Sequence, residues 1–491
     1  MMAFLAKGYS LFSLTVLEST LPFVRMMILS RALPLRELGF VSALTATLST
    51  FEQMTDFAIY RFLFSVRREK YEEALASAHT LSVLRGIVVG SLAVAAGPLI
   101  ARGLSLSENW IDFSLLGLVI FIRSFDHLAP RVAERDYRYG VQLKVSGIAY
   151  AAGLTTLLAG LLITRSHVAF LASIIVQSIA QITASHSLAD TPYRLKIRSP
   201  LLIQAFRFGY PLMFNGMGLA ATAQGDRFIV GALLGLPALG VYAVATIAAY
   251  VPMGMLSRLT GTFLLAALYN ASHLTNGVYE ARVRFAARAV PIAAGLYALG
   301  IVTLMNVVVP LVFGRQFHLS REAVALLAVA CFFRIVRGDP FTSMLTHEGR
   351  TRRLAVANLS STSALLFELA LILIFNTFES VFAGRLLGEA IGVGAILFVT
   401  LGHFRRALPD WIGSATFSLA VVGGAIALSF MTSVGDRPIA SFMTLIGCFA
   451  IFALYAARYA LPHFRSAFPG KLLVSGDPAA AGDAAAKSVE V

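Results

Sequence analysis

Long apolar stretches, separated by short polar breaks, run through almost the whole 491-residue chain. An α-helix needs about 20 predominantly apolar residues to cross the hydrocarbon core of a bilayer, and about fourteen stretches reach that length. We expect them at approximately 10–33, 38–59, 75–100, 111–130, 141–163, 167–188, 201–234, 239–268, 285–312, 321–345, 354–376, 380–402, 411–432 and 439–461. The sequence therefore predicts an all-α, polytopic membrane protein.

The distribution of charge supports this interpretation. Only 13% of the residues are charged, against about a quarter in soluble domains. When successive loops are assigned alternately to the two sides, about 24 Lys and Arg fall on the side of both termini and about seven on the other. Because cytoplasmic loops carry the excess of Lys and Arg, both termini are predicted to be cytoplasmic.

The same loop bias explains the formal net charge of +14, so we do not expect nucleic-acid binding. The basic loops can still contact the headgroups of membrane lipids. The sequence contains no G-x-x-x-x-G-K-[ST] phosphate loop, no H-E-x-x-H and no Cys/His cluster with metal spacing. No predicted outer loop is long enough for a catalytic domain. We therefore expect no enzymatic activity, no catalytic residue, no cofactor and no metal site.

One stretch combines helix-weakening residues with charge at membrane depth. It spans 207–245 and reads RFGYPLMFNGMGLAATAQGDRFIVGALLGLPALGVYAVA. Asn215 lies between a proline and several glycines, and Asp226 and Arg227 follow before a turn expected at 236–238. A charge inside a span costs roughly 2.5–3.5 kcal/mol on the lenient insertion scale, so it is expected to face protein or a water-filled cavity. A charged span softened by Gly and Pro indicates a transport site.

A similar arrangement occurs near the N-terminus. Arg25 lies in an apolar run that turns at 32–37. With one gap, Arg25 aligns with Arg227, and the Leu-Gly pair at 38–39 aligns with the pair at 239–240. This similarity predicts two related halves that each open with an Arg-bearing helix. Six spans per half give equivalent helices the same direction, so the halves would be parallel repeats about an axis along the membrane normal.

The repeat suggests a division of the chain into pseudo-symmetric six-helix lobes. The basic segment 190–200, which contains two prolines, marks the boundary between them. We expect an N-terminal lobe at 1–190, a C-terminal lobe at 191–402, two further helices at 403–469 and a disordered cytoplasmic tail at 470–491.

Several segments carry a resemblance to a known family. They are LSRALPLRELGFVSAL after the first span, the segment from FGYPLMF to GVYAVA around the seventh, and VPLVFGRQFHLSREAVALLAVACFFRIVRGDPF with HEGRTRRLAVANL around the ninth to eleventh. In this order the chain resembles the Wzx-like polysaccharide flippases of the multidrug/oligosaccharidyl-lipid/polysaccharide exporter superfamily. The resemblance implies transport of an undecaprenyl-diphosphate-linked oligosaccharide to the outer leaflet of the bacterial cytoplasmic membrane. It also implies a proton or sodium gradient as the energy source, and a polysaccharide polymerase or glycosyltransferase complex as a partner.

Arg25 and Arg227 are the best candidates for substrate binding. Each precedes its outer turn by about seven or eight residues, or 10–12 Å along a helix. Neither has an acidic residue three or four positions away in its own helix, and arginine forms paired hydrogen bonds to phosphate oxygens. We predict that both face a cavity and bind the diphosphate, with Asn215 as a further substrate contact. The alternative for each arginine is an ion pair with an acid of another helix.

The other intramembrane charges are predicted to serve ion coupling or structure. The acidic candidates for these roles are Glu18, Glu52, Asp56 and Asp226. Two pairs have helical spacing, Arg123 with Asp126 and Arg385 with Glu389, and are expected to pair within their helices.

Two other functions stay open at this point. A multidrug cation antiporter of the same superfamily should have a site dominated by carboxylates, whereas the repeat-start helices here carry arginine. A non-transporting scaffold for a glycan assembly complex would not need buried arginines, and its charges could be neutralised without loss of function.

Overall fold

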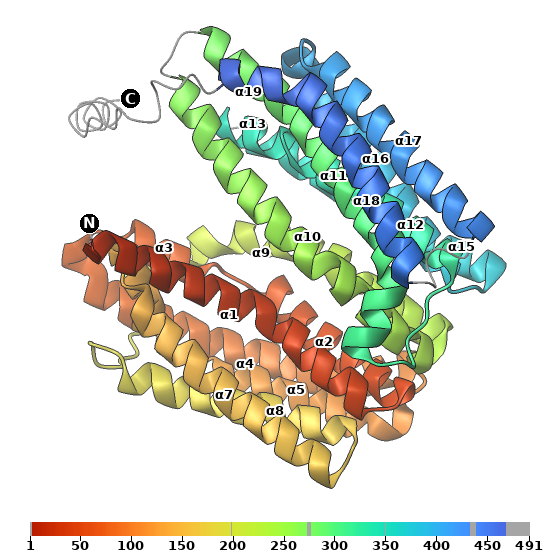
Figure 1. Cartoon of the computed structure of the whole chain (residues 1–491). Coiled ribbons are helices and arrows are strands. Elements are labelled where there is room, and N and C mark those ends of the chain that lie inside the picture. The colour runs from red at the N-terminus through yellow and green to blue at the C-terminus, as the bar shows by residue number, and fades with distance from the viewer. Residues whose placement is uncertain (1, 198, 273–275, 349, 433–437, 468–491) are drawn as a thin grey trace. The chain divides into compact units, whose positions relative to one another are not determined.

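The computed structural model describes residues 2–197, 199–272, 276–348, 350–432 and 438–467. Within these ranges all regular structure is helical (Figure 1). Nine helices of this described part are long and apolar enough to cross a membrane, judged by length and composition. The predicted all-α, multi-pass architecture is confirmed, while the number of fourteen crossings stays a prediction. The predicted tail at 470–491 lies outside the described residues.

The chain forms two compact units, and several helices contribute residues to both. The first unit comprises Met1–Pro252, Val308–Ser320 and Thr362–Gly388, and the second comprises Met253–Val307, Arg321–Ser361 and Glu389–Val491. The predicted lobes at 1–190 and 191–402 stay a prediction.

Most of the first unit comes from the N-terminal half of the chain. Its helices are α1 (Met2–Ala32), α2 (Leu35–Met54), α3 (Ile59–Ser65), η1 (Arg68–Lys70), α4 (Tyr71–Gly103), η2 (Ser107–Asn109), α5 (Trp110–Arg123), α6 (Ala129–Val132), η3 (Ala133–Asp136), α7 (Tyr139–Ile163), α8 (His167–Ser187), α9 (Pro200–Leu233), the start of α10 (Gly235–Ser272), α15 (Ala364–Phe375) and the start of α16 (Glu379–Phe404).

The second unit contains most of the C-terminal helices. They are the rest of α10, most of α11 (Asn276–Phe313), α12 (Arg321–Gly338), α13 (Phe341–His347), α14 (Thr351–Ser360), η4 (Ser361–Ser363) at the division, the rest of α16, α17 (Leu408–Thr432), α18 (Pro438–Tyr455), the π-helical turn η6 (Ala456–Ala460) and α19 (Leu461–Ala467).

Local sequence sets the ends of these helices. Ser199 caps α9, because its side-chain oxygen accepts a hydrogen bond from the Leu201 amide at 3.2 Å. Asn376, with φ of 49°, ends α15 in the left-handed conformation that asparagine tolerates. Gly235 has φ of 85° and starts α10 directly after α9, so the turn lies before the predicted 236–238. The glycines and proline of α9 do not interrupt it between Pro200 and Leu233.

Three predicted spans are broken in the structure, whereas the span at 354–376 stays helical through α14, η4 and α15. The span at 38–59 divides into α2 and α3, where Ala58 has φ of 47° and its amide donates to Asp56 Oδ1 at 2.8 Å. The spans at 111–130 and 321–345 divide into α5 with α6 and α12 with α13. Hydropathy averaged over a span-length window does not detect these breaks, because each break covers only a few residues.

The two aligned Leu-Gly pairs meet in the first unit. A Cβ added at Gly39 of α2 would lie 1.9 Å from the carbonyl oxygen of Leu236, and a Cβ at Gly240 of α10 would lie 2.5 Å from that of Leu35. Each glycine thus abuts the carbonyl four positions before the other. Only a hydrogen fits at these two positions, and the reciprocal contact agrees with an internal repeat that begins at α1 and at α9.

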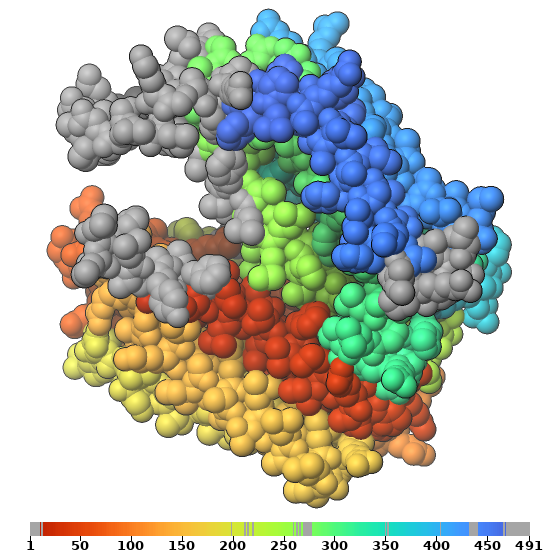
Figure 2. All heavy atoms as spheres, in the orientation of Figure 1, coloured from red at the N-terminus to blue at the C-terminus, as the bar shows by residue number. Residues whose placement is uncertain are grey.

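Helix pairs build the rest of the first unit. α4 packs on α5, α7 on α8, α2 on α9, and α1 on α7. Figure 2 shows the atoms of α1 in contact with those of neighbouring helices on one face of the unit. A buried apolar cluster that includes Phe62, Leu75 and Leu201 joins α3, α4 and α9 near one end of these helices.

Two histidines of the first unit contact backbone carbonyl groups in the connection between α8 and α9. His127 Nε2 lies 2.9 Å from the Thr191 carbonyl oxygen, and His79 Nδ1 lies 3.4 Å from that of Arg194. Lys196 adds an ion pair to Glu73 at 2.9 Å. The segment predicted as a lobe boundary is therefore held along its length.

Ion pairs join the helices of the second unit. Asp410 of α17 accepts from Arg284 at 2.7 Å and Arg288 at 2.6 Å, both on α11. Glu389 of α16 pairs with Arg337 of α12 at 3.0 Å.

Candidate functional site

A cavity of about 470 Å³ lies inside the first unit, between α1, α2, α7, α8, α9 and α10. Arg25 of α1 and Arg227 of α9 both lie on its wall. No Asp or Glu is among its described lining residues. The other polar and aromatic side chains of the wall include Ser42, Thr45, Ser49, Tyr150, Phe170, Gln177 and Tyr250.

Arg25 is held by α8. Its Nη2 donates to Gln177 Oε1, and its guanidinium lies over the Phe170 ring, 5.8 Å from the centroid. Within the described part of the chain, no carboxylate lies within ion-pairing distance of it. The Arg25 Nε and the Ser42 hydroxyl are shielded from solvent and have no hydrogen-bond partner among the described residues. Since buried polar groups are normally paired, both positions suit a ligand or water that the cavity can hold.

Arg227 is oriented in the same manner. Its Nη1 donates to Gln224 Oε1, one turn earlier on α9, at 3.1 Å. The described residues again provide no ion pair. An amide oxygen fixes the direction of a guanidinium without cancelling its charge, and both arginines are half-buried on the cavity wall. This geometry suits a polyanion that can accept hydrogen bonds from both guanidinium groups.

The other sequence candidates whose side chains are described do not line this cavity. The side chain of Asn215 is outside the described residues, although its backbone belongs to α9. Glu18 is half-buried on α1. Asp56 accepts a hydrogen bond from the Ala58 amide in the turn before α3. Glu52 pairs with Arg123 at 2.5 Å, and its carbonyl accepts from Arg85 at 3.1 Å.

Asp226 belongs to a separate buried cluster that sequence reasoning did not assemble. Its Oδ2 accepts from the Tyr242 hydroxyl at 2.5 Å and lies 3.4 Å from Arg385 Nη1. The same Arg385 nitrogen lies 3.7 Å from Glu368 Oε1, and the Glu368 side chain is 0% exposed. The cluster thus joins α9, α10, α15 and α16, and it places two carboxylates beside the Arg385 guanidinium.

Both predicted pairings within a helix are wrong. Arg123 pairs with Glu52, because α5 ends at Arg123 and Asp126 is no longer on the same helix. Arg385 pairs with Asp226 and Glu368, while Glu389 pairs with Arg337 of α12. Residues four apart share a helix face. Here, however, both arginines form ion pairs with carboxylates of neighbouring helices. Only the tertiary arrangement shows them.

The aromatic part of the cavity was also missed. Tyr150, Phe170 and Tyr250 come from α7, α8 and α10 and are ordinary apolar-helix residues in the sequence. No spacing or motif singles them out. Among the described residues, no group of three or more His, Cys, Asp or Glu is arranged to hold a metal ion.

Comparisons with known proteins bear on the fold and the family. A family model described as "Polysaccharide biosynthesis protein" matches residues 28–322. No curated protein matches the chain. A solved structure described as lipid II flippase MurJ, inward closed conformation, is similar with a TM-score of 0.64 and 13% identity, over 92% of this chain and 99% of that one.

A second similar structure is described as the inward-facing conformation of a multidrug resistance MATE family transporter of the MOP superfamily. Its TM-score is 0.56 at 14% identity, over 82% of this chain and 98% of that one. At such identities the similarity concerns the fold, which is the polytopic helical architecture of these membrane proteins.

Proposed function

The chain belongs to the family of polysaccharide biosynthesis proteins, and from that premise we propose that it is a flippase for an undecaprenyl-diphosphate-linked oligosaccharide. The family match and the similar fold support the resemblance to the flippase superfamily noted in the sequence. The protein would work in the bacterial cytoplasmic membrane with both termini in the cytoplasm, as the loop charges predict.

One observation carries the substrate proposal: Arg25 and Arg227 line the same cavity, and the described residues neutralise neither. A diphosphate would receive hydrogen bonds from both guanidinium groups. Hydroxyl and aromatic side chains of the wall suit the first sugar units, while the polyprenyl chain stays in lipid. The reaction would be alternating access with no bond made or broken, and partners in glycan polymerisation would act on the delivered product.

The test is binding of undecaprenyl diphosphate to the purified full-length protein, measured by native mass spectrometry. A charge-assisted hydrogen bond contributes about 1.5–3 kcal/mol, and 1.4 kcal/mol is tenfold in affinity. We expect Arg25→Ala and Arg227→Ala each to weaken binding about tenfold or more. Lysine variants should lose less, because they keep the charge but not the two-pronged donor set.

Arg207→Ala is the matched control, since Arg207 is exposed on α9 and does not line the cavity. It should bind like the wild type. Wild-type affinity in either alanine variant of the cavity would refute the shared site. Normal surface polysaccharide production by cells carrying both alanine substitutions would favour the scaffold alternative.

A multidrug cation antiporter is the second candidate, because a MATE transporter is among the similar structures. Its cationic substrates would require carboxylates on the cavity wall, and the described lining contains two arginines instead. The charge of the cavity therefore favours an anionic substrate.

We assign ion coupling to the cluster of Asp226, Glu368 and Arg385. Asp226 and Glu368 both lie within 3.7 Å of the Arg385 guanidinium, where a proton or a sodium ion would compete with Arg385 for a buried carboxylate. Glu368→Gln should make transport in proteoliposomes independent of both gradients, with unchanged binding of undecaprenyl diphosphate. The variant removes a buried charge, so the protein should still fold. A gradient dependence equal to that of the wild type would exclude this cluster from coupling.

A further inference from the structure

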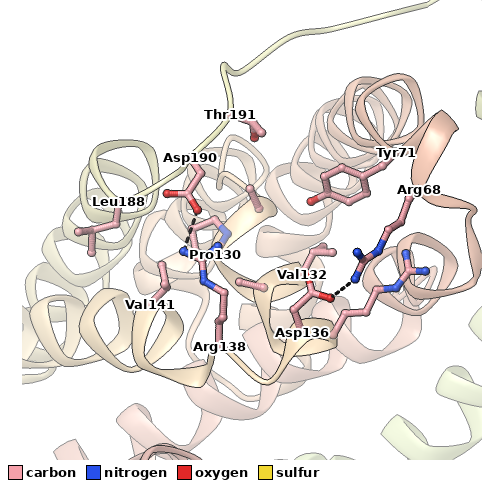
Figure 3. Close-up of a pocket in the computed structure, with 13 residues that line it drawn as sticks. Arg68, Tyr71, Pro130, Val132, Asp136, Arg138, Val141, Leu188, Asp190 and Thr191 are labelled. Carbon is pink, nitrogen blue, oxygen red and sulfur yellow. Dashed lines mark hydrogen bonds and ion pairs between the residues drawn. The ribbon is translucent and has the colours of Figure 1, made fainter. Parts of the chain in front are cut away.

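A second pocket, of about 360 Å³, lies in the first unit and shares no lining residue with the cavity (Figure 3). It is formed by η1, α6, η3, the start of α7 and the residues that follow α8. Arg68, Arg135 and Arg138 line it. The loops that form it belong to the Lys- and Arg-rich side of the chain, which is predicted to face the cytoplasm.

Two of these arginines hold aspartates. Arg68 Nη2 lies 2.9 Å from Asp136 Oδ1, and Arg138 Nη2 lies 2.8 Å from Asp190 Oδ2. Figure 3 shows the two pairs on opposite sides of the pocket. The four side chains are 80%, 54%, 54% and 67% exposed in the order named. Exposed ion pairs contribute only about 0–1 kcal/mol, so a competing anion can open them.

The third arginine leaves the pocket with an excess of positive charge. Arg135 Nη1 donates to the Val66 carbonyl oxygen at 2.9 Å, and no carboxylate pairs with it in the described part of the chain. The Thr191 hydroxyl on the same wall is shielded from solvent and has no hydrogen-bond partner among the described residues. Three guanidinium groups and one donor hydroxyl thus meet two aspartates.

We propose that this pocket binds the phosphodiester of an anionic phospholipid headgroup in the cytoplasmic leaflet. The excess charge matches the single negative charge of a phosphodiester, and the volume lies in the range of small-molecule sites. Basic pockets between the cytoplasmic ends of membrane helices are suited to anionic headgroups.

Apolar groups beside the arginines favour a lipid over free phosphate. Val141 and Leu188 line the pocket, and Tyr137, next to Asp136, is 63% exposed. Tyrosine is enriched at the membrane–water interface, where its ring contacts lipid and its hydroxyl contacts water. Because Arg138 holds Asp190 at the start of the α8–α9 connection, a headgroup on Arg138 would compete with that contact.

The experiment is native mass spectrometry of the purified full-length protein with phosphatidylglycerol, phosphatidylethanolamine or inorganic phosphate. We expect the wild type to retain phosphatidylglycerol about tenfold more strongly than phosphatidylethanolamine. Arg135→Gln and Arg138→Gln should each remove most of this preference. Arg61→Gln is the matched control, because Arg61 is exposed on α3 and lies outside the pocket, and it should keep the preference.

A thermal melt of each variant in detergent checks that it folds, and Arg138→Gln carries the test if Arg135→Gln is unstable. Equal retention of the two lipids by the wild type would overturn the proposal. An equal loss of this lipid preference in Arg61→Gln would also overturn it, because that result would indicate a general attraction to a basic surface. Displacement of phosphatidylglycerol by millimolar inorganic phosphate would identify a free-phosphate site instead of a lipid site.

Discussion

At the residue scale, the buried and half-buried arginines on the helices of the first unit differ in the group that holds them. Arg123 and Arg385 are held by carboxylates, whereas Arg25 and Arg227 are held by the amide oxygens of Gln177 and Gln224. A carboxylate partner neutralises the guanidinium, and an amide partner only orients it. The proposed phosphate contact of Arg25 and Arg227 rests on this difference, because no described carboxylate pairs with either of them.

This difference leads to a prediction for Gln177, which is buried beside Arg25. Gln177→Glu keeps the size of the side chain but would neutralise Arg25 by an ion pair. We expect binding of undecaprenyl diphosphate to fall about tenfold or more, with a melting temperature equal to or above that of the wild type. Gln204→Glu, on the exposed surface of α9, should leave binding unchanged. Full binding by Gln177→Glu would show that the charge of Arg25 is not used.

At the element scale, α2 and α10 approach each other through backbone atoms. Gly39 and Gly240 each face the carbonyl at the start of the partner helix, with no room for a methyl group. The contact joins the two helices that follow the Arg-bearing helices α1 and α9. It therefore connects the two predicted repeats directly beyond the residues that line the cavity.

We predict that Gly39→Ala and Gly240→Ala each destabilise the protein by roughly 1–3 kcal/mol, the usual cost of overpacking. Gly147→Ala is the control, because a methyl group at this position in α7 meets no atom within 4 Å. Alanine has the higher helix propensity, so this control should be neutral or slightly stabilising. Thermal melting in detergent measures all three variants. A normal melting temperature for Gly39→Ala would mean that α2 and α10 are further apart than the structure places them.

At the scale of the whole molecule, the loop charges predict on which side of the membrane each loop lies, and the structure gives the helices that connect the loops. Exposed η1, between α3 and α4, lies on the predicted cytoplasmic side, and η2, between α4 and α5, on the outer side. The long helix α4 passes between them, and its length and composition allow it to cross a membrane. Sidedness at its two ends therefore tests the topology directly.

Cysteine labelling with an impermeant maleimide on intact cells should modify Ser107→Cys and spare Glu69→Cys until the cells are opened. Wild-type protein, whose Cys331 is buried and Cys448 half-buried, supplies the background. Labelling of both positions from the same side would contradict the predicted orientation of α4 and, with it, the cytoplasmic placement of the termini.

The sequence alone determined the fold class, the approximate places of the helices and the two arginines of interest. Hydropathy and loop charge are sums over neighbouring residues, and the cost of a charge in lipid depends on its depth, so each can be evaluated without knowledge of packing. The tertiary structure alone decided what surrounds each charge. It broke three predicted spans, paired Arg123 and Arg385 with acids of other helices, and placed Gln177, Tyr150 and Tyr250 on one wall with Arg25. These contacts join helices far apart in the sequence, where local spacing carries no information about which faces meet.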